Sequence, residues 1–422
     1  MTAQLREALR LAAERAPAYP VQQRAIATAR RRRVAAGLAV VAVIGALALI
    51  VPLARTPVPV RPAVPTVALP DRIGLPPFGA RRDTDRPGMA AATVLFSGSG
   101  ARFGGWIDEP TRYGLVGTDD DYRTLNTGFH PESGGAALLS PDGRSVAYSG
   151  NGRVVEVVTL ADLSLRHLVG DDGTPALTAD PIAWSPDGRW LVVRGSTGPD
   201  DVLSLVDLAV GTWARLAEAP RSVSFPAVAF AADGRLAYQR GNEVWVLGVG
   251  GAQVSTFSLP VGSVLAGRGA WTPDGAALTV VPRSGSAWSA RYVDPGSGLA
   301  RTGPVLPGLR EVTVRELIGW WPDGSALVSV HDAQSARIVA LAPGAATATT
   351  VLTAPAQVTD VEVASEVLAS GRTRAGDPAG SLGPRFRRAL AEILVGAAAV
   401  LLGAWWLRRW ATRRRSRRVT WS

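Results

Sequence analysis

The most regular feature of this 422-residue sequence is the distribution of its apolar and polar positions. Residues 34–54 form an apolar run without a charge, and residues 389–407 form a second run whose single charge is Glu392. At roughly 1.5 Å of rise per residue, a helix of either length crosses a hydrocarbon core of about 30 Å. Between the two runs, short segments of alternating apolar and polar residues are typical of β-strands. The pattern therefore predicts a strand-rich region between two transmembrane helices.

The strand-rich region repeats itself. Five segments contain an apolar or aromatic approach, a Pro-Asp-Gly or Ala-Asp-Gly turn and a β-branched run, and their turn aspartates are spaced 45, 46, 41 and 49 residues apart. The turn residues are Asp142 and Gly143, Asp187 and Gly188, Asp233 and Gly234, Asp274 and Gly275, and Asp323 and Gly324. A period in the forties with several strands per unit is typical of β-propeller blades. Because five aspartates occupy one turn position, we interpret them as structural rather than catalytic.

The tripeptide has a physical reason to form a tight hairpin. Proline presets φ near about −65°, aspartate accepts hydrogen bonds from the backbone amides just ahead, and glycine adopts a positive φ at little steric cost. Aromatic residues precede four of the turns, namely Trp184, Phe230, Trp271 and Trp320. We expect these rings to pack between neighbouring blades rather than to stack on a ligand.

These repeats resemble those of the TolB-like, WD40-like β-propellers. The resemblance is carried best by WSPDGRWLVV at residues 184–193, and with its relatives it covers roughly residues 134–350. The arrangement of the whole chain resembles membrane-anchored propeller proteins of actinobacteria. Two departures concern turn detail: Ala232 replaces proline in the third repeat, and the fourth repeat lacks the arginine that follows glycine in the first three. The resemblance implies an all-β propeller.

The number of blades follows from the strands outside the repeats. Residues 90–128 and 357–370 contain strand-like runs without the turn tripeptide. Joined, they make one composite blade in which C-terminal strands close the ring against N-terminal strands. Closure leaves no unpaired edge and brings both ends of the head to one place. We predict six blades, with five to seven left open.

The sequence thus predicts seven consecutive parts. They are a cytoplasmic basic segment with a short helix (1–33), a transmembrane helix (34–54), a Pro-rich extracytoplasmic linker (55–88), an extracytoplasmic β-propeller (89–371), a second linker (372–388), a transmembrane helix (389–407) and a basic cytoplasmic tail (408–422). A cleaved signal peptide is the alternative for the first helix, and the length of its apolar run argues against it.

Charge fixes the predicted orientation. The net charge of +10 comes from arginine alone, since lysine is absent, and it divides into +6 in residues 1–33, +9 in residues 385–422 and −5 between them. Arginine-rich flanks stay on the cytoplasmic side of a membrane. The residues with this topogenic role are Arg30, Arg31, Arg32, Arg33, Arg408, Arg409, Arg413, Arg414 and Arg415. We therefore expect a plasma-membrane protein with both termini in the cytoplasm, the lipid bilayer as a partner and no nucleic acid.

Candidate chemistry is sparse. The sequence has no cysteine and three histidines, which excludes disulfides, thiolate nucleophiles and cysteine-ligated metals. Ser329, His331 and Asp332 supply the residue types of a catalytic triad, but strand alternation points Asp332 away from His331. The acidic residues at 119–121 and 171–172 lack the spacing of a calcium loop. We expect no catalytic, cofactor-binding or metal site, and no cofactor.

Three functional hypotheses fit this organisation. The favoured one is a membrane-anchored extracytoplasmic propeller that binds or scaffolds a protein, a peptide or an envelope glycan, with a sensory role left open. The second is an extracytoplasmic propeller enzyme such as a glycan hydrolase or lyase, with acids in the propeller channel. The third is a membrane regulator that acts through its cytoplasmic N-terminal segment, where residues 3–16 have helical spacing.

Overall fold

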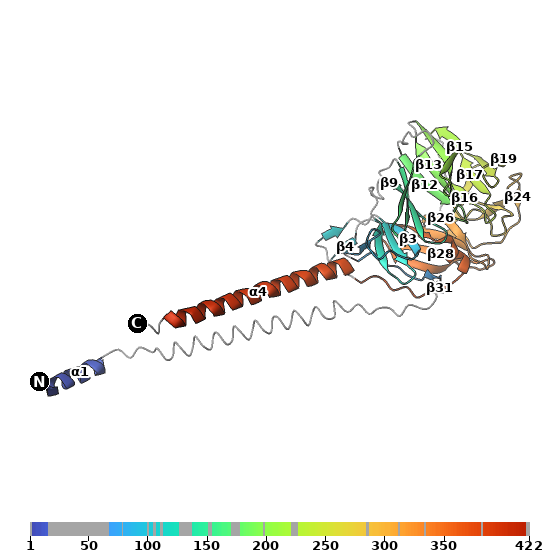
Figure 1. Ribbon diagram of the computed structural model, residues 1–422. Helices are drawn as coiled ribbons and strands as arrows, with labels where there is room; N and C mark the ends of the chain where they lie inside the picture. Colours follow the sequence, from blue (N-terminus) through green and yellow to red (C-terminus); the bar gives the residue numbers. More distant parts are fainter. Residues whose placement is uncertain are drawn as a thin grey trace. The chain divides into compact units, whose positions relative to one another are not determined.

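The computed structural model describes residues 2–15, 67–77, 79–98, 101–103, 107–109, 113–125, 137–150, 154–169, 178–196, 199–220, 227–283, 287–310, 313–332, 335–380 and 383–418. The chain divides into two compact units, which are described separately. Residues 59–386 form the larger unit, called the head below, and it contains every described strand (Figure 1). Residues 1–58 and 387–422 form the smaller unit.

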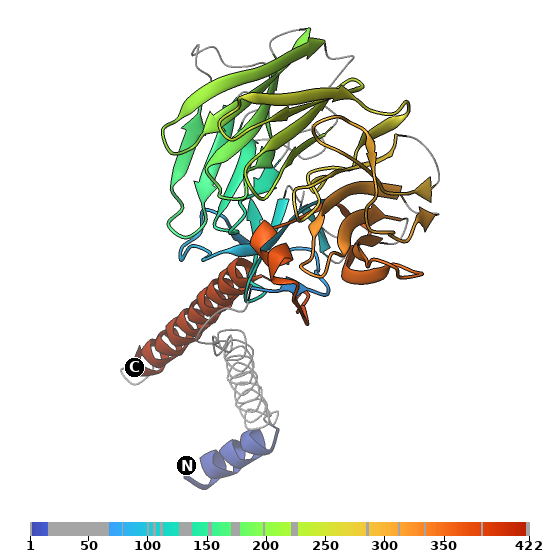
Figure 2. The same cartoon turned by 90° about the vertical axis from the view of Figure 1, so that its right-hand side faces the viewer.

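The head is a six-bladed β-propeller, and the predicted all-β class and blade number are confirmed (Figure 2). Five blades are antiparallel sheets of four strands, one for each turn tripeptide, in the orders β8-β9-β10-β11, β12-β13-β14-β15, β16-β17-β18-β19, β20-β21-β23-β24 and β26-β27-β28-β29. The first strands of neighbouring blades contact one another, as β12 does with β8 and β16, so they surround the central axis.

The strands of the first three blades have the following bounds: β8 (Ala137–Leu139), β9 (Ser145–Gly150), β10 (Val154–Thr159), β11 (Leu165–Leu168), β12 (Thr178–Trp184), β13 (Trp190–Ser196), β14 (Asp200–Asp207), β15 (Thr212–Pro220), β16 (Val228–Phe230), β17 (Leu236–Arg240), β18 (Glu243–Leu247) and β19 (Gln253–Ser258). The strands of the next two are β20 (Ser263–Leu265), β21 (Leu278–Pro282), β23 (Arg291–Val293), β24 (Ala300–Arg301), β26 (Thr313–Trp320), β27 (Ala326–His331), β28 (Ser335–Leu341) and β29 (Thr349–Pro355).

The sixth blade is composite and closes the ring. Its order is β30-β3-β6-β7-β2, built from β30 (Val358–Val363), β3 (Ala92–Gly98), β6 (Tyr113–Gly117), β7 (Tyr122–Leu125) and β2 (Arg81–Arg82). The C-terminal β30 is the innermost strand and pairs antiparallel with β3, with Val363 opposite Val94. One detail of the prediction is corrected: the C-terminal segment supplies a single strand, and the residues after it form the short helix α3 (Ser365–Ser370).

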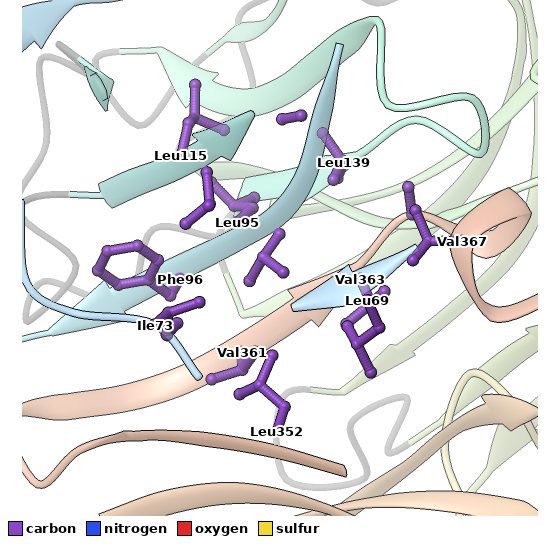
Figure 3. Close-up of a cluster of buried hydrophobic side chains, with 14 of the residues drawn as sticks. Leu69, Ile73, Leu95, Phe96, Leu115, Leu139, Leu352, Val361, Val363 and Val367 are labelled. Atoms are coloured by element: carbon purple, nitrogen blue, oxygen red, sulfur yellow. The ribbon is translucent and has the colours of Figure 1, made fainter. Parts of the chain in front are cut away.

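Closure is reinforced by an apolar cluster at the composite blade. Buried residues from both ends of the head meet there, among them Leu69, Phe96, Val361 and Val367 (Figure 3). The cluster also takes in Leu352 of the fifth blade. Because sequence-distant strands share one core, the ends of the head hold the ring shut.

The predicted linkers are partly folded into the head. Leu69 and Ile73, within the Pro-rich segment, are 0% and 3% exposed. β1 (Leu69–Pro70) pairs in parallel with β31 (Thr373–Arg374), which lies in the predicted second linker. The described part of the first predicted linker, from residue 67, and at least residues 373 and 374 of the second are therefore packed into the head. Burying apolar side chains of a Pro-rich segment stabilises it without a regular hydrophobic period.

Two further strand pairs complete the head. They are β4 (Ala101–Phe103) with β5 (Ile107–Glu109), and β22 (Ala287–Trp288) with β25 (Leu309–Arg310).

The smaller unit contains helical segments. α1 (Thr2–Arg15) occupies the predicted N-terminal helix, and its Leu5 and Leu9 are exposed. α4 (Pro384–Arg418) contains a stretch from Phe386 to Trp410 that is long and apolar enough to cross a membrane. α4 begins before the predicted span and continues into the basic tail, so Arg408 and Arg409 prolong the same helix. The predicted span at 34–54 and Arg30 to Arg33 lie outside the described residues.

Candidate ligand-binding site at the turn-side mouth

A cavity of about 500 Å³ lies on the propeller axis. Every blade contributes residues at or just after the end of its first strand, including Leu138, Trp184, Phe230, Trp271, Trp320 and Glu362. Since the turn tripeptides follow these strands, the cavity opens at the turn-bearing end of the axis. We call it the turn-side mouth.

The five turns that frame this mouth share one geometry. Each turn glycine has a positive φ, between 65° and 85°. Its N–H donates to the carbonyl of the residue three positions earlier, at 2.8–3.0 Å in all five turns. Each turn aspartate accepts a hydrogen bond through Oδ1 from the backbone N–H two residues later, as Asp142 does from Arg144 at 3.0 Å. The aspartates are therefore engaged with their own turns and hold the hairpins rigid.

Two aromatic residues before the turns link blades as expected. The indole N–H of Trp271 donates to the carbonyl of Ala229 at 3.1 Å, and that of Trp320 donates to the carbonyl of Gly269 at 2.8 Å. In both pairs the acceptor belongs to the preceding blade. These rings bridge blades and line the mouth at the same time.

Trp184 and Trp321 behave differently. Both side chains are half-buried and line the mouth, and the Nε1 atom of each is buried without a hydrogen-bond partner among the described residues. A buried donor left unpaired costs about 1–3 kcal/mol. Trp184 and Trp321 therefore each bury an unpaired indole N–H within the wall of the mouth.

An ion cluster lies at the base of the mouth. The Arg268 guanidinium, which follows β20, donates through Nε to Glu316 Oε1 of β26 at 3.1 Å, and its Nη2 contacts the same oxygen. Its Nη1 lies 2.9 Å from Glu362 Oε1 of β30. One cation from the fourth blade therefore joins carboxylates of the fifth and sixth blades.

Burial sets the electrostatics of this cluster. It raises the pKa of Glu362 from 4.5 to about 7, and Asp360 and Glu316 act in the same direction. Arg268 and a backbone N–H donated by Leu139 act against the rise. Burial alone would lower the pKa of Arg268, but Glu316 and Glu362 outweigh it, and the net shift is upward. Glu362 is thus poised to change its charge near neutral pH.

Helix α3 forms part of the rim. Ser365, Glu366, Leu368 and Ala369 line the mouth, and the backbone N–H of Glu366 donates to the carbonyl of Pro141 at 3.0 Å. A Cβ on Gly319 would lie 2.7 Å from Leu368, so glycine is what allows α3 to approach β26 closely. The helix narrows the mouth from one side.

A second cavity of about 550 Å³ lies at the other end of the first strands. Its lining includes Val264, Thr359, Asp360 and Glu316. Glu316 thus belongs to this cavity, whereas its partner Arg268 lines the turn-side mouth. The ion cluster therefore lies between the two cavities.

Several of the residues that the sequence singled out for chemistry have structural partners, whereas the Nε2 atom of His331 is buried without a hydrogen-bond partner among the described residues. Asp332 accepts hydrogen bonds from the Ser335 N–H at 2.8 Å and from Arg337 at 2.5 Å. Asp120 binds Arg374, and Glu392 pairs with Arg388 four residues earlier. Residues 171–172 lie outside the described residues. Within the described part of the chain, no group of three or more His, Cys, Asp or Glu residues is arranged to hold a metal ion.

Comparisons with known proteins found similar solved structures but no family. No protein-family model and no curated protein matches the chain. Similar solved structures include TolB from Acinetobacter baumannii, with 16% identity, a TM-score of 0.44 and coverage of 65% of this chain and 66% of that one. Another is a putative TolB from Agrobacterium tumefaciens, with 15% identity, a TM-score of 0.39 and coverage of 62% and 89%. The neighbours also include an oligogalacturonate lyase in complex with manganese, with 18% identity, a TM-score of 0.40 and coverage of 57% and 70%.

These likenesses concern the fold alone. The predicted β-propeller fold of the head is confirmed by its own sheet topology. The resemblance to membrane-anchored proteins of actinobacteria stays a prediction.

Proposed function

We propose that this protein is a membrane-anchored, extracytoplasmic binding module whose propeller takes up a protein segment, a peptide or an envelope glycan at the turn-side mouth. The observation that carries the proposal is a cavity of about 500 Å³ that is lined by all six blades and includes the indole rings of Trp184 and Trp321. A concave, largely apolar site with a few placed polar groups is the usual form of a binding pocket.

The membrane anchor rests on α4. Its apolar stretch is followed by Arg408, Arg409, Arg413, Arg414 and Arg415, which favour a cytoplasmic C-terminus. With the predicted helix at 34–54, the proposed topology leaves both termini in the cytoplasm and the head outside the plasma membrane. The ligand is then a component of the cell envelope.

Site-specific photocrosslinking in the native membrane tests the binding site. Ala369 of α3 and Ala232 of the third turn are exposed and line the mouth, so either can carry a benzoylphenylalanine. We expect both positions to capture the same envelope component after illumination. Adding Trp184→Ala to the Ala369 probe should abolish the capture, because it removes one wall of the cavity.

Val261 provides the matched control, since its side chain is 99% exposed and does not line the mouth. A probe at Val261 should capture nothing in common with the mouth positions. Capture of the same component from Val261, or from the Trp184→Ala variant, would contradict the proposal.

An enzymatic role is the second candidate, and one observation favours it. Glu316, Glu362 and Asp360 meet on the axis, and the raised pKa of Glu362 would let it donate a proton near neutral pH. The pairing of Arg268 with both glutamates argues against free catalytic carboxylates. The purified protein should be incubated with envelope glycans: turnover that Glu362→Gln abolishes would favour the enzyme, and its absence favours the binding module.

A further inference from the structure

The charge balance at the turn-side mouth is negative. Among the described residues that line it, Arg268 is the only cation, whereas Glu362 and Glu366 supply carboxylates and Glu316 is bonded to Arg268 from behind. With Glu362 ionised, two lining carboxylates face one guanidinium, and Glu316 offsets the charge of that guanidinium from the other cavity. A cavity with this balance attracts positive charge and disfavours anions.

Arg268 is a poor anion receptor. Its Nε and Nη2 both contact Glu316, and its Nη1 contacts Glu362, so three of its five N–H donors are directed at carboxylates. An anion drawn to the other two donors would lie beside these carboxylates, whose negative charge repels it. The guanidinium therefore mainly holds the wall of the site together.

The walls of the mouth suit a cation for a second reason. The half-buried rings of Trp184, Phe230, Trp320 and Trp321 line it, and aromatic faces attract ammonium and guanidinium groups. The Trp271 ring is 3% exposed and already has the Arg235 guanidinium 4.6 Å from its centroid. The carboxylates and the half-buried rings together fit a basic side chain presented by a peptide.

We infer that the turn-side mouth recognises a lysine or arginine side chain of an extracytoplasmic peptide segment, with the cation among the indole rings and near Glu366 and Glu362. The inference rests on the proposed function, because it names the chemical class of the ligand for the same site. It assigns the half-buried indole rings and the carboxylates to the basic side chain.

Three capped pentapeptides test the charge requirement directly: Gly-Gly-Lys-Gly-Gly, the same peptide with norleucine, and the same peptide with glutamate. The full-length protein in phosphatidylcholine nanodiscs is titrated calorimetrically, with empty nanodiscs as the blank. Norleucine keeps the apolar stem of lysine and removes only the charge. We expect the lysine peptide to bind roughly tenfold more tightly than the norleucine peptide, and the glutamate peptide to bind least.

Single substitutions test which residues produce the preference for the lysine peptide. Glu366 is exposed on α3, so Glu366→Gln should weaken the lysine peptide several-fold while leaving the norleucine peptide and the thermal midpoint unchanged. Trp184→Leu removes an aromatic face and keeps an apolar side chain, so it should weaken the lysine peptide more than the norleucine peptide. Glu243→Gln, on an exposed residue of β18 that does not line the mouth, is the matched control and should change neither.

The outcomes separate the two proposals. Equal binding of the lysine and norleucine peptides, tighter binding of the glutamate peptide, or no binding of the lysine peptide at concentrations on the order of 10 mM would each overturn the cation inference. If crosslinking at Ala369 still captures a component that Trp184→Ala abolishes, the proposed binding function stands and only the ligand class is wrong. If that capture fails as well, both are wrong.

Discussion

Arg268 places a guanidinium where three blades meet and holds two carboxylates that would otherwise repel each other. Its contacts to Glu316 and Glu362 join β26 and β30 across the propeller axis. Glu362 gains this partner but also loses water, and desolvation dominates its titration. The ionisation of Glu362 alone therefore makes the stability of the head depend on pH.

The first prediction concerns this pH dependence. Burial raises the pKa of Glu362 from 4.5 to about 7, so the folded state binds more protons than the unfolded state between these values. Its contribution to the free energy of unfolding is then largest at or below about pH 4.5 and falls, by about 3 kcal/mol at most, as the pH rises to about 7. Denaturant unfolding of wild type and Glu362→Gln across this range measures the difference.

Because glutamine does not titrate, Glu362→Gln should gain stability relative to wild type as the pH rises through this window. The exposed Glu243→Gln variant controls for the general effect of removing a carboxylate. If the difference in unfolding free energy between wild type and Glu362→Gln stays constant from pH 4.5 to 7, Arg268 compensates the burial of Glu362 completely.

The second prediction compares two turn glycines with equal backbone geometry. Gly143 and Gly188 have φ of 69° and 70°. A Cβ on Gly188 meets nothing within 4 Å, whereas one on Gly143 would lie 2.1 Å from the carbonyl oxygen of Ala92 in the composite blade. Gly188→Ala should cost about 1 kcal/mol of unfolding free energy through strain, and Gly143→Ala about 3 kcal/mol because it also overpacks.

Chemical denaturation of the two alanine variants measures these losses, and Gly188→Ala is the internal control for strain. Equal losses would mean that the Ala92 strand moves aside freely. In that case the contact between the first blade and the composite blade would not contribute to ring closure.

At the scale of elements, the sequence predicts the repeated turns and the blades, but it misses short elements outside the repeats such as α3. The five turns are predictable because proline, aspartate and glycine act locally, within four residues. Helix α3 is not, since its six residues follow a strand without a break and the helix is held by its packing on Gly319 and by the left-handed Gly371 at its end. The segment around Leu69 and Ile73 contains too few apolar residues to show the alternation that predicts a strand.

The candidate site was missed for a related reason. Arg268, Glu316 and Glu362 are far apart in sequence and meet only because three first strands share an axis. A signal existed: each is a charged residue in or beside a first strand that is otherwise mostly apolar. Aligning the repeats on their turns would have placed Arg268 and Glu316 at nearly the same depth, three and four residues before the aromatic residue.

The third prediction concerns the pairing of β1 with β31. Arg374 of β31 contacts both oxygens of Asp120, at 2.6 and 2.7 Å, and the same carboxylate accepts the backbone N–H of Asp377. Asp120→Ala should therefore lower the unfolding free energy by about 2 kcal/mol. It should also increase hydrogen exchange at Leu69, whose N–H donates to the carbonyl of Arg372.

The neighbouring Asp119 is exposed, and Asp119→Ala serves as the matched control in the same exchange experiment. Similar exchange at Leu69 in wild type and Asp120→Ala would indicate that the strand pair persists without the ion pair.

At the scale of the whole molecule, the head keeps its two ends together. β1 and β31 pair in parallel, and Arg72 donates to the carbonyl of Gly376 while Asp71 accepts the N–H of Gly376. The chain therefore enters and leaves the head along one seam. An arrangement of this kind suits a head tethered at both ends, because neither tether needs to cross the propeller to reach the same membrane.

The absence of native cysteine makes the proposed topology directly measurable. A single Val261→Cys substitution places a thiol on a side chain that is 99% exposed on the head, and Ser416→Cys places one in the basic C-terminal part of α4. Arginine-rich flanks remain in the cytoplasm because their translocation is disfavoured. In intact cells, a membrane-impermeant maleimide should therefore label Val261→Cys fully and Ser416→Cys only after permeabilisation. The opposite pattern would invert the topology, and labelling of both in intact cells would place the basic tail outside, leaving the arginines without a topogenic role.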